Sequence, residues 1–433
     1  MKNRKLFFYR SLARRLTPTE AAELAERARY RAIGAIMIVL GLGGYLLFAN
    51  SVDPELVSTF GMSRGGSTVR VEDWVVPTYS TVALLSALSV FAGAYQFVRG
   101  FARLANAIFG LIILLFVFSF LTWATRDQSI NLVGMLDAAV ERAVPLALGA
   151  LSGVLSERAG VVNIAIEGMM LSGAMFGSLI GSVSQSAWGG LAASVLVGLL
   201  LSLFHGVLSI RYKVDQIISG VVINIFSIGI TSFISAKFLQ QFQALNSPPR
   251  FPTTPIPVLS DIPIVGEILF NGNMFLYAMY VFLILVHVGL FYTRWGLRTR
   301  AVGEHPKAAD TLGVNVFRTR YTAVLLSGMM AGFAGAYFTL GSVGRFEELM
   351  TAGRGFISLA AMIFGKWMPF GAFGAALIFG FAESLQGKLA ILKVPIPSQF
   401  LLMAPYVATM IALAGLIGRT TAPAADGQPY EKE

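Results

Sequence analysis

Charged and amide side chains are scarce in the apolar stretches of this sequence, and three groups of them stand out. One lies in the segment SERAGVVNIAIEG, residues 156–168, and a second directly follows Lys213. The third, Asp137, Glu141 and Arg142 before Pro145, supports no functional prediction. Ionisable groups are costly in hydrocarbon, so within membrane segments they commonly mark a solute or ion path. We therefore predict a substrate path or gate that contains Glu157, Arg158, Asn163, Glu167, Asp215, Gln216 and Asn224.

Two structural alternatives remain open for these groups. Residues 156–168 could form a cytoplasmic turn in which Glu157 and Arg158 pair as a salt bridge. The residues near Gln216 could serve only as hydrogen-bonding contacts between helices. Irregular backbone at membrane depth is tolerated only where it lines a cavity or is buried in protein.

The sequence contains no residue grouping that is typical of an enzyme. It has no Ser/His/Asp grouping, HExxH motif, Walker A loop or GxGxxG turn between a strand and a helix. The three histidines lack metal-ligand spacing, and the absence of cysteine excludes disulfides and thiolate metal sites. We therefore predict a protein that is not an enzyme and holds neither a metal nor a cofactor. If ATP drives it, ATP and Mg²⁺ bind a separate ATPase chain.

The most polar long interval between two apolar segments is residues 294–321, which we name the basic loop. It carries five arginines and Lys307 against two acidic residues. Inside it, Pro306 suits the first position of a helix, and Gly313 suits the position after its end, where φ is often positive. The pattern predicts a two-turn helix that docks into a groove of another protein. The alternative is an ordinary cytoplasmic loop anchored by arginines.

Composition places the chain among polytopic all-α membrane proteins. Hydrophobic residues make up 55% of the 433 residues and charged residues only 13%, with a mean hydropathy of +0.70. A soluble domain has about 25% charged residues. The net charge of +10 lies mainly in short loops and the N-terminal arm. Positive residues there are retained on the cytoplasmic side, so the charge does not indicate nucleic acid binding.

Apolar runs and charge alternation predict about 12 membrane segments, with both termini in the cytoplasm. One of them, 356–366, is too short for an upright span and is typical of a half-helix. Before the first span, Thr17–Glu20 predicts an amphipathic helix on the inner membrane surface; the alternative is a solvated tail. The predicted segments are 32–49, 80–98, 103–125, 134–155, 162–184, 188–210, 214–236, 273–293, 321–341, 356–366, 370–386 and 399–418.

Five sequence blocks occur in the order found in one transporter family. They are residues 156–170, residues 215–220 with Asn224, 303–313, 353–360 and 363–371. Together they resemble the membrane permeases of binding-protein-dependent ABC importers for nucleosides and simple sugars, relatives of the ribose and branched-chain amino acid permeases. In the third block, Lys307 replaces the Glu of the wider E-A-A-x-x-x-G permease pattern.

The resemblance implies a type II ABC importer-like bundle in the cell (inner or plasma) membrane. Its partners would be a cytoplasmic ABC ATPase, a second permease copy or homologue, an external solute-binding protein and membrane lipid. The basic loop would couple to the ATPase through Gly303, Glu304, Pro306, Lys307, Ala308, Ala309, Asp310 and Gly313. The external binding protein would dock at Arg345, Glu347, Glu348 and Arg354.

The predicted organisation has four parts. A basic arm, 1–31, precedes three helices in 32–130 that the resemblance does not cover, and the permease core follows in 131–418. The polar tail, 419–433, is expected to be disordered. Two alternative functions remain: a branched-chain amino acid permease of the same type, and an ion-coupled secondary transporter that uses Glu157, Glu167 or Asp215.

Overall fold

The computed structural model describes residues 18–65, 70–392, 400, 403 and 422–432 and divides into two compact units. Unit 1 contains Met1–Met62, Glu72–Asn131 and Leu392–Val394. Unit 2 contains Ser63–Val71, Leu132–Ile391 and Pro395–Glu433. The chain passes from unit 1 to unit 2 between Asn131 and Leu132. The division into extra helices and a permease core stays a prediction.

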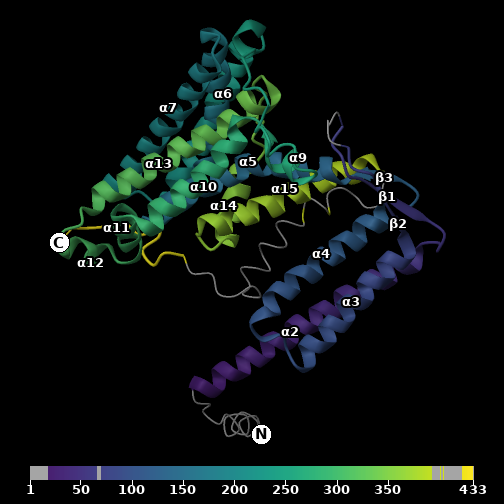
Figure 1. The fold of residues 1–433 in the computed structure, drawn as a ribbon. Helices are drawn as coiled ribbons and strands as arrows, with labels where there is room; N and C mark the ends of the chain where they lie inside the picture. Colours follow the sequence, from purple (N-terminus) through teal and green to yellow (C-terminus); the bar gives the residue numbers. More distant parts are fainter. Residues whose placement is uncertain (1–17, 66–69, 393–399, 401–402, 404–421, 433) are drawn as a thin grey trace, which may run out of the picture. The chain divides into compact units, whose positions relative to one another are not determined.

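Unit 1 consists of three long helices and a small sheet (Figure 1). The helices are α2 (Pro18–Leu47), α3 (Thr78–Val98) and α4 (Ala105–Ala124). The sheet has the order β2-β1-β3, with β1 antiparallel to β2 and parallel to β3. Its strands are β1 (Val57–Gly61), β2 (Trp74–Pro77) and β3 (Ser129–Asn131).

The N-terminal prediction needs correction. An amphipathic surface helix followed by a separate span at 32–49 was expected, but α2 runs without a break from Pro18 to Leu47. Its sequence is rich in Ala, Leu, Arg and Glu, and no proline interrupts it after the first position, so nothing ends the helix at the polar-to-apolar change. Gly34 lets α2 approach α3 closely, because a Cβ there would lie 2.7 Å from the backbone N of Phe97.

Unit 2 is a helical bundle in which α5, α6 and α13 are the most buried long helices (Figure 1). Two short strands, β4 (Thr254–Pro255) and β5 (Asn271–Gly272), pair antiparallel, with α9 between them in the chain. Three helices continue into π-helical segments, Val207–Arg211, Ser235–Leu239 and Tyr337–Val343. The helices are α5 (Leu132–Glu157), α6 (Ile166–Ser184), α7 (Ala187–Gly206), α8 (Gln216–Ile234), α9 (Val265–Leu269), α10 (Met274–Tyr292), α11 (Arg294–Glu304), α12 (Pro306–Thr311), α13 (Val316–Ala336), α14 (Arg354–Phe364) and α15 (Pro369–Ile391).

Small residues set the helix spacing in unit 2. A Cβ at Gly198 of α7 would lie 2.2 Å from the carbonyl oxygen of Gly328 in α13. A Cβ at Gly173 of α6 would lie 2.7 Å from the carbonyl oxygen of Gly332. These helices therefore pack backbone against backbone, as small-residue faces permit in membrane bundles.

The polytopic helical architecture is confirmed. Nine helices in the described part of the chain are long and apolar enough to cross a membrane. Arg354–Phe364 is an apolar helix of only 11 residues, which matches the predicted short segment. The predicted span 399–418 lies outside the described residues except at 400 and 403.

Candidate functional site

The chain between α5 and α6, residues 158–165, is irregular, and side chains from other helices satisfy its backbone. Gly160 turns the chain there with a φ of +79°. The N–H of Val162 donates to Oε1 of Gln216 at 2.7 Å, and its carbonyl oxygen lies 2.9 Å from Nε2 of His205. Both side chains are buried. We refer to residues 158–165 as the α5–α6 break.

Two asparagines complete the support of the α5–α6 break. Asn224 of α8 donates from Nδ2 to the carbonyl oxygen of Ile164 at 2.9 Å and accepts from the N–H of Gly168 at 2.7 Å. Asn163 accepts from the N–H of Ala165 and donates to Oγ of Ser327 on α13. Because buried backbone groups in membrane proteins need internal partners, these amides position the break. A contact with a transported solute remains a prediction for them.

Glu167 joins the start of α6 to the start of α14. Its Oε1 accepts from the hydroxyl of Thr351 at 2.6 Å and from the N–H of Gly353 at 2.9 Å, and its Oε2 accepts from the N–H of Gly355 at 2.6 Å. The carboxylate therefore occupies the N-terminus of α14, where free N–H groups and the helix dipole favour a negative charge. Asp215 has a comparable local role, because its Oδ1 accepts from the N–H groups of Ile217 and Ile218 at the start of α8.

Glu157 and Arg158 both contact the turn between α14 and α15. Oε2 of Glu157 accepts from the indole N–H of Trp367 at 2.5 Å, and Nε of Arg158 donates to the carbonyl oxygen of Trp367 at 2.9 Å. Lys366 and Trp367 both have positive φ, 58° and 53°. Among the described residues, Glu157 and Arg158 do not pair with each other, so the suggested salt bridge is not formed. Burial lowers the pKa of the Arg158 guanidinium.

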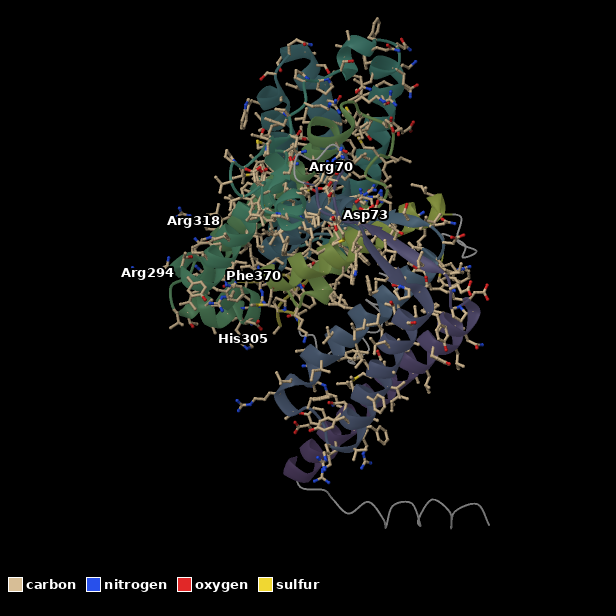
Figure 2. All side chains as sticks on the ribbon, turned by 45° about the vertical axis from the view of Figure 1, so that its right-hand side comes forward. Arg70, Asp73, Arg294, His305, Arg318 and Phe370 are labelled. Carbon is tan, nitrogen blue, oxygen red and sulfur yellow. The ribbon has the colours of Figure 1, made fainter. Side chains whose placement is uncertain are left out.

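The basic loop folds into two helices, α11 and α12. Pro306 is the first residue of α12, and Gly313 follows its end with a φ of +82°, which confirms the predicted capped helix. Ala309 is buried, whereas Lys307 and Ala308 are exposed. Leu312, at the end of the helix, is 85% exposed. Figure 2 shows Arg294, His305 and Arg318 projecting outward around this end of unit 2.

The basic loop touches the α5–α6 break at Gly303, the next-to-last residue of α11. This glycine is fully packed against the backbone of Arg158 and Gly160. Its carbonyl oxygen accepts from the N–H of Ala425 at 2.9 Å, and Oε2 of Glu304 accepts from the N–H of Ala424 at 3.1 Å. Three parts of the chain far apart in sequence therefore meet at Gly303.

The segment 422–432 is ordered against the basic loop, contrary to the disorder expected from its composition (Figure 1). Nη1 of Arg320 donates to the carbonyl oxygen of Gln428 at 2.9 Å. Tyr430 is buried in a small apolar cluster with Val302, Ala309 and Val316. The ring of Tyr430 and hydrogen bonds to the backbone hold this segment in place. Its polar composition did not predict that it would pack. We name this segment the tail clamp.

The carboxyl group of Asp426, half-buried in the tail clamp, lies beside Glu157 at the end of α5. Burial raises the pKa of Asp426 to about 6, although Glu157 hydrogen-bonds it and Arg320 lies nearby, and both contacts lower its pKa. At the exposed end of the tail clamp, Nζ of Lys213 donates to Oε1 of Glu431 at 2.5 Å, and this hydrogen bond lowers the pKa of Glu431.

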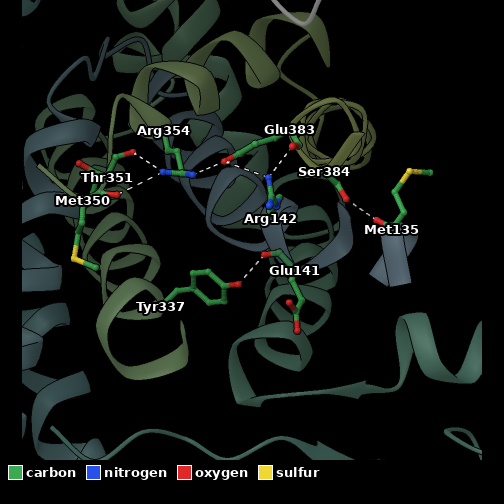
Figure 3. A network of polar contacts seen from close by, with 9 residues as sticks. All are labelled: Met135, Glu141, Arg142, Tyr337, Met350, Thr351, Arg354, Glu383 and Ser384. Carbon is green, nitrogen blue, oxygen red and sulfur yellow. Dashed lines mark hydrogen bonds and ion pairs between the residues drawn. The ribbon is translucent and has the colours of Figure 1, made fainter. Parts of the chain in front are cut away.

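The four residues predicted to dock a binding protein lie around two cavities, and Glu347 lines both. Arg345 and Glu347 pair at 2.7 Å, and both line a cavity of about 480 Å³ together with Glu348. Arg354 instead hydrogen-bonds Oε1 of Glu383 on α15 (Figure 3). The same carboxylate lies 3.9 Å from Nη1 of Arg142, so two arginines share one acidic partner. Sequence reasoning missed this network, because Glu383 is the only acidic residue within its apolar stretch and has no local partner.

Comparisons with known proteins agree with this architecture. The model of the branched-chain amino acid transport system / permease component family matches residues 135–417. The guanosine ABC transporter permease protein NupQ of Bacillus subtilis (strain 168) is 43% identical over 309 residues, covering 69% of this chain and 96% of that protein. No solved structure matches the chain.

Two further relatives differ in their named solutes. The nucleoside ABC transporter permease protein NupC of Lactococcus lactis subsp. cremoris (strain MG1363) is 42% identical over 299 residues, covering 66% of this chain and 93% of that protein. The putative glucose ABC transporter permease protein TsgC13 of Haloferax volcanii is 37% identical over 257 residues, covering 58% of this chain and 77% of that protein. With a matched family model over 135–417 and this helical bundle, the chain belongs to the family of permease components of branched-chain amino acid transport systems.

Proposed function

We propose that this chain is the membrane permease subunit of an ATP-driven ABC importer for nucleosides or related simple sugars. Two relatives named as guanosine and nucleoside permeases align with it over more than nine-tenths of their own length. The putative glucose permease keeps simple sugars within the proposal.

The observation that carries the proposal is the contact of the basic loop with the α5–α6 break. The helix α12 buries Ala309 and exposes Lys307, Ala308 and Leu312, as a helix that inserts into a groove of a partner does. Gly303, three residues before the start of α12, lies directly against the α5–α6 break. Movement of α12 by a cytoplasmic ATPase therefore reaches α5, α6 and the turn before α15 through packed backbone, as in rigid-body switching.

The remaining partners follow from the same proposal. A second permease copy or homologue completes the membrane pore, and an external solute-binding protein docks near Arg345, Glu347 and Glu348. With Arg345, Glu347 and Glu348 on the outer side of the membrane, the proposal puts the basic loop, the N-terminus and the tail clamp in the cytoplasm. The positive charge of the basic loop supports this orientation. ATP and Mg²⁺ belong to the ATPase.

The test is purification of the chain with its co-expressed partner subunits. Ala308→Glu places a charge on the exposed face of α12, and we expect the ATPase to be lost from the complex while the permease still inserts. Gln240→Glu, at another exposed position, serves as the control and retains the ATPase. Retention of the ATPase by Ala308→Glu would contradict the coupling role of α12.

Uptake into proteoliposomes separates the alternative functions. ATP-dependent nucleoside uptake that survives an uncoupler supports the proposal. Leucine uptake in its place would favour the branched-chain amino acid alternative. Dependence on an ion gradient would favour a secondary transporter, although Glu167 and Asp215 already cap α14 and α8.

A further inference from the structure

A cavity of about 330 Å³ opens beside the shared carboxylate of Glu383, and we name it the arginine cavity. This volume lies at the lower end of the range for small-molecule sites, about 300–1,000 Å³. Its wall comes from α5, the π-helical segment 337–343, the following loop, α14 and α15. The lining includes Arg142, Tyr337, Phe338, Glu347, Arg354 and Glu383.

Three backbone irregularities meet at this cavity. Pro145 interrupts the hydrogen bonding of α5, and the π-helical segment begins at Tyr337. The short helix α14 starts at Arg354, directly after Gly353 with a φ of +79°. Transporters commonly form their solute sites at such discontinuous helices, and π-helical turns are frequent at functional sites.

The two arginines keep hydrogen-bonding capacity for a solute. Nη1 of Arg142 donates to the carbonyl oxygen of Glu383 at 2.6 Å, while its Nε and Nη2 have no hydrogen-bond partner among the described residues. The Arg142 side chain is 38% exposed, and the side chains of Arg354 and Glu383 are 24% and 22% exposed. The polar groups therefore remain accessible although they belong to membrane segments.

The cavity also offers aromatic surface. Phe338 lies in the wall with the guanidinium of Arg354 5.7 Å from its ring centre, and Tyr337 packs edge-on against it. Phe338 is only 6% exposed, so it offers a planar heterocycle an apolar edge in the wall, beside the hydrogen-bond donors of Arg142.

The charges of the lining favour an uncharged solute. Two positive residues, Arg142 and Arg354, face two negative ones, Glu347 and Glu383, so the formal charges cancel. A charged solute would enter without a counter-charge, which is costly in a confined site. From these observations we propose that the arginine cavity is a binding station for a neutral nucleoside, with Phe338 contacting the base from the wall and Arg142 donating hydrogen bonds to the solute. The choice of nucleoside rests on the proposed function.

Site-directed labelling tests this station, because the chain contains no cysteine. Ser342→Cys places one thiol in the cavity wall of the complete transporter. We expect guanosine at ten times its Kd to slow maleimide labelling of this chain by about tenfold. Ser129→Cys, exposed in unit 1, serves as the control and labels at the same rate with or without guanosine.

A second substitution tests the wall itself. In the Ser342→Cys background, Phe338→Leu should raise the guanosine concentration for half-protection by about threefold, because the wall loses an aromatic contact. Phe226→Leu, exposed on α8, should not change it. If guanosine does not slow labelling, the proposed station is wrong. It is also wrong if leucine or guanosine monophosphate slows labelling and guanosine does not. ATP-driven nucleoside uptake is measured separately, so loss of protection with intact uptake refutes the station and leaves the proposed function standing. Protection without uptake refutes the importer and leaves the station standing.

Discussion

Gly303 and Arg158 are in direct backbone contact. A Cβ at Gly303 would lie 2.3 Å from the carbonyl oxygen of Arg158 and 2.9 Å from its carbonyl carbon. No side chain intervenes between the basic loop and the α5–α6 break at this point. A displacement of α11 therefore cannot be absorbed by a rotamer change before it reaches the break.

Gly303→Ala should uncouple ATP hydrolysis from transport. The added methyl group forces the two backbones apart, and overpacking of this kind costs about 1–3 kcal/mol. A shift of about 1.4 kcal/mol changes a population by tenfold, so we expect the solute transported per ATP hydrolysed to fall by about tenfold. Gly374→Ala is the matched control, because a Cβ at Gly374 meets nothing within 4 Å. Equal coupling ratios for the two variants would contradict this role of the contact.

Asn224→Ala should destabilise unit 2 by removing two partners of the α5–α6 break at once. The carbonyl oxygen of Ile164 and the N–H of Gly168 would both lose their hydrogen bonds. Each buried polar group left unpaired costs about 1–3 kcal/mol. Thermal unfolding of the purified protein measures the loss, and Gln240→Ala, an exposed amide, should stay within about 0.5 kcal/mol of the wild type. An unchanged Tm for Asn224→Ala would mean that water replaces the amide.

Glu167→Gln should open the start of α14. The carboxylate accepts from Thr351, Gly353 and Gly355, and an amide nitrogen in place of one oxygen cannot accept from a backbone N–H. We expect faster hydrogen exchange over residues 351–358 and a loss of about 1–3 kcal/mol in stability. The same change at exposed Glu348 should leave this exchange unaltered. Gly355→Ala gives an independent check, because its Cβ would lie 2.5 Å from Cα of Glu167.

The attachment of the tail clamp should weaken as pH rises from about 4 to above 6. The pKa of Asp426 is raised to about 6 by burial, so the clamped state favours the protonated carboxyl group. The stabilisation that protonated Asp426 gives to the attached state is complete below the ordinary aspartate pKa and is lost as pH rises past about 6. The equilibrium constant for attachment then falls by at most about tenfold per pH unit. The rate of limited proteolysis at residues 422–432 measures how often the tail clamp detaches.

Asp426→Asn supplies the control for that titration. The amide stays uncharged at every pH, so no charge has to be buried when the tail clamp is attached. We therefore expect tighter attachment above pH 7 and a flatter pH profile. Arg320 and Glu157 face the same carboxyl group and remain unchanged in this variant. A wild-type profile that stays flat between pH 4 and 7 would refute the titration of Asp426.

Features that depend on neighbouring residues could be predicted from the sequence, whereas contacts between residues far apart in the chain could not. Pro306 and Gly313 predicted α12 correctly, because both residues act on the backbone of the turn that contains them. The length of the apolar run at 356–366 likewise predicted the short helix α14. Glu167 was recognised as important, but its partner is the start of α14, and no local pattern links positions 188 residues apart. The tail clamp was missed for the same reason, since backbone groups and the single ring of Tyr430 hold it.

The cap that Glu167 provides also bears on how the membrane part is made. The start of α14 depends on a carboxylate that the ribosome has delivered much earlier in the chain. Before the two meet, the first N–H groups of α14 have no internal partner, and hydrocarbon offers none. The short helix therefore cannot settle in the bilayer as an independent insertion unit. Biogenesis must retain α6 within reach of the insertion machinery until Arg354–Phe364 has emerged.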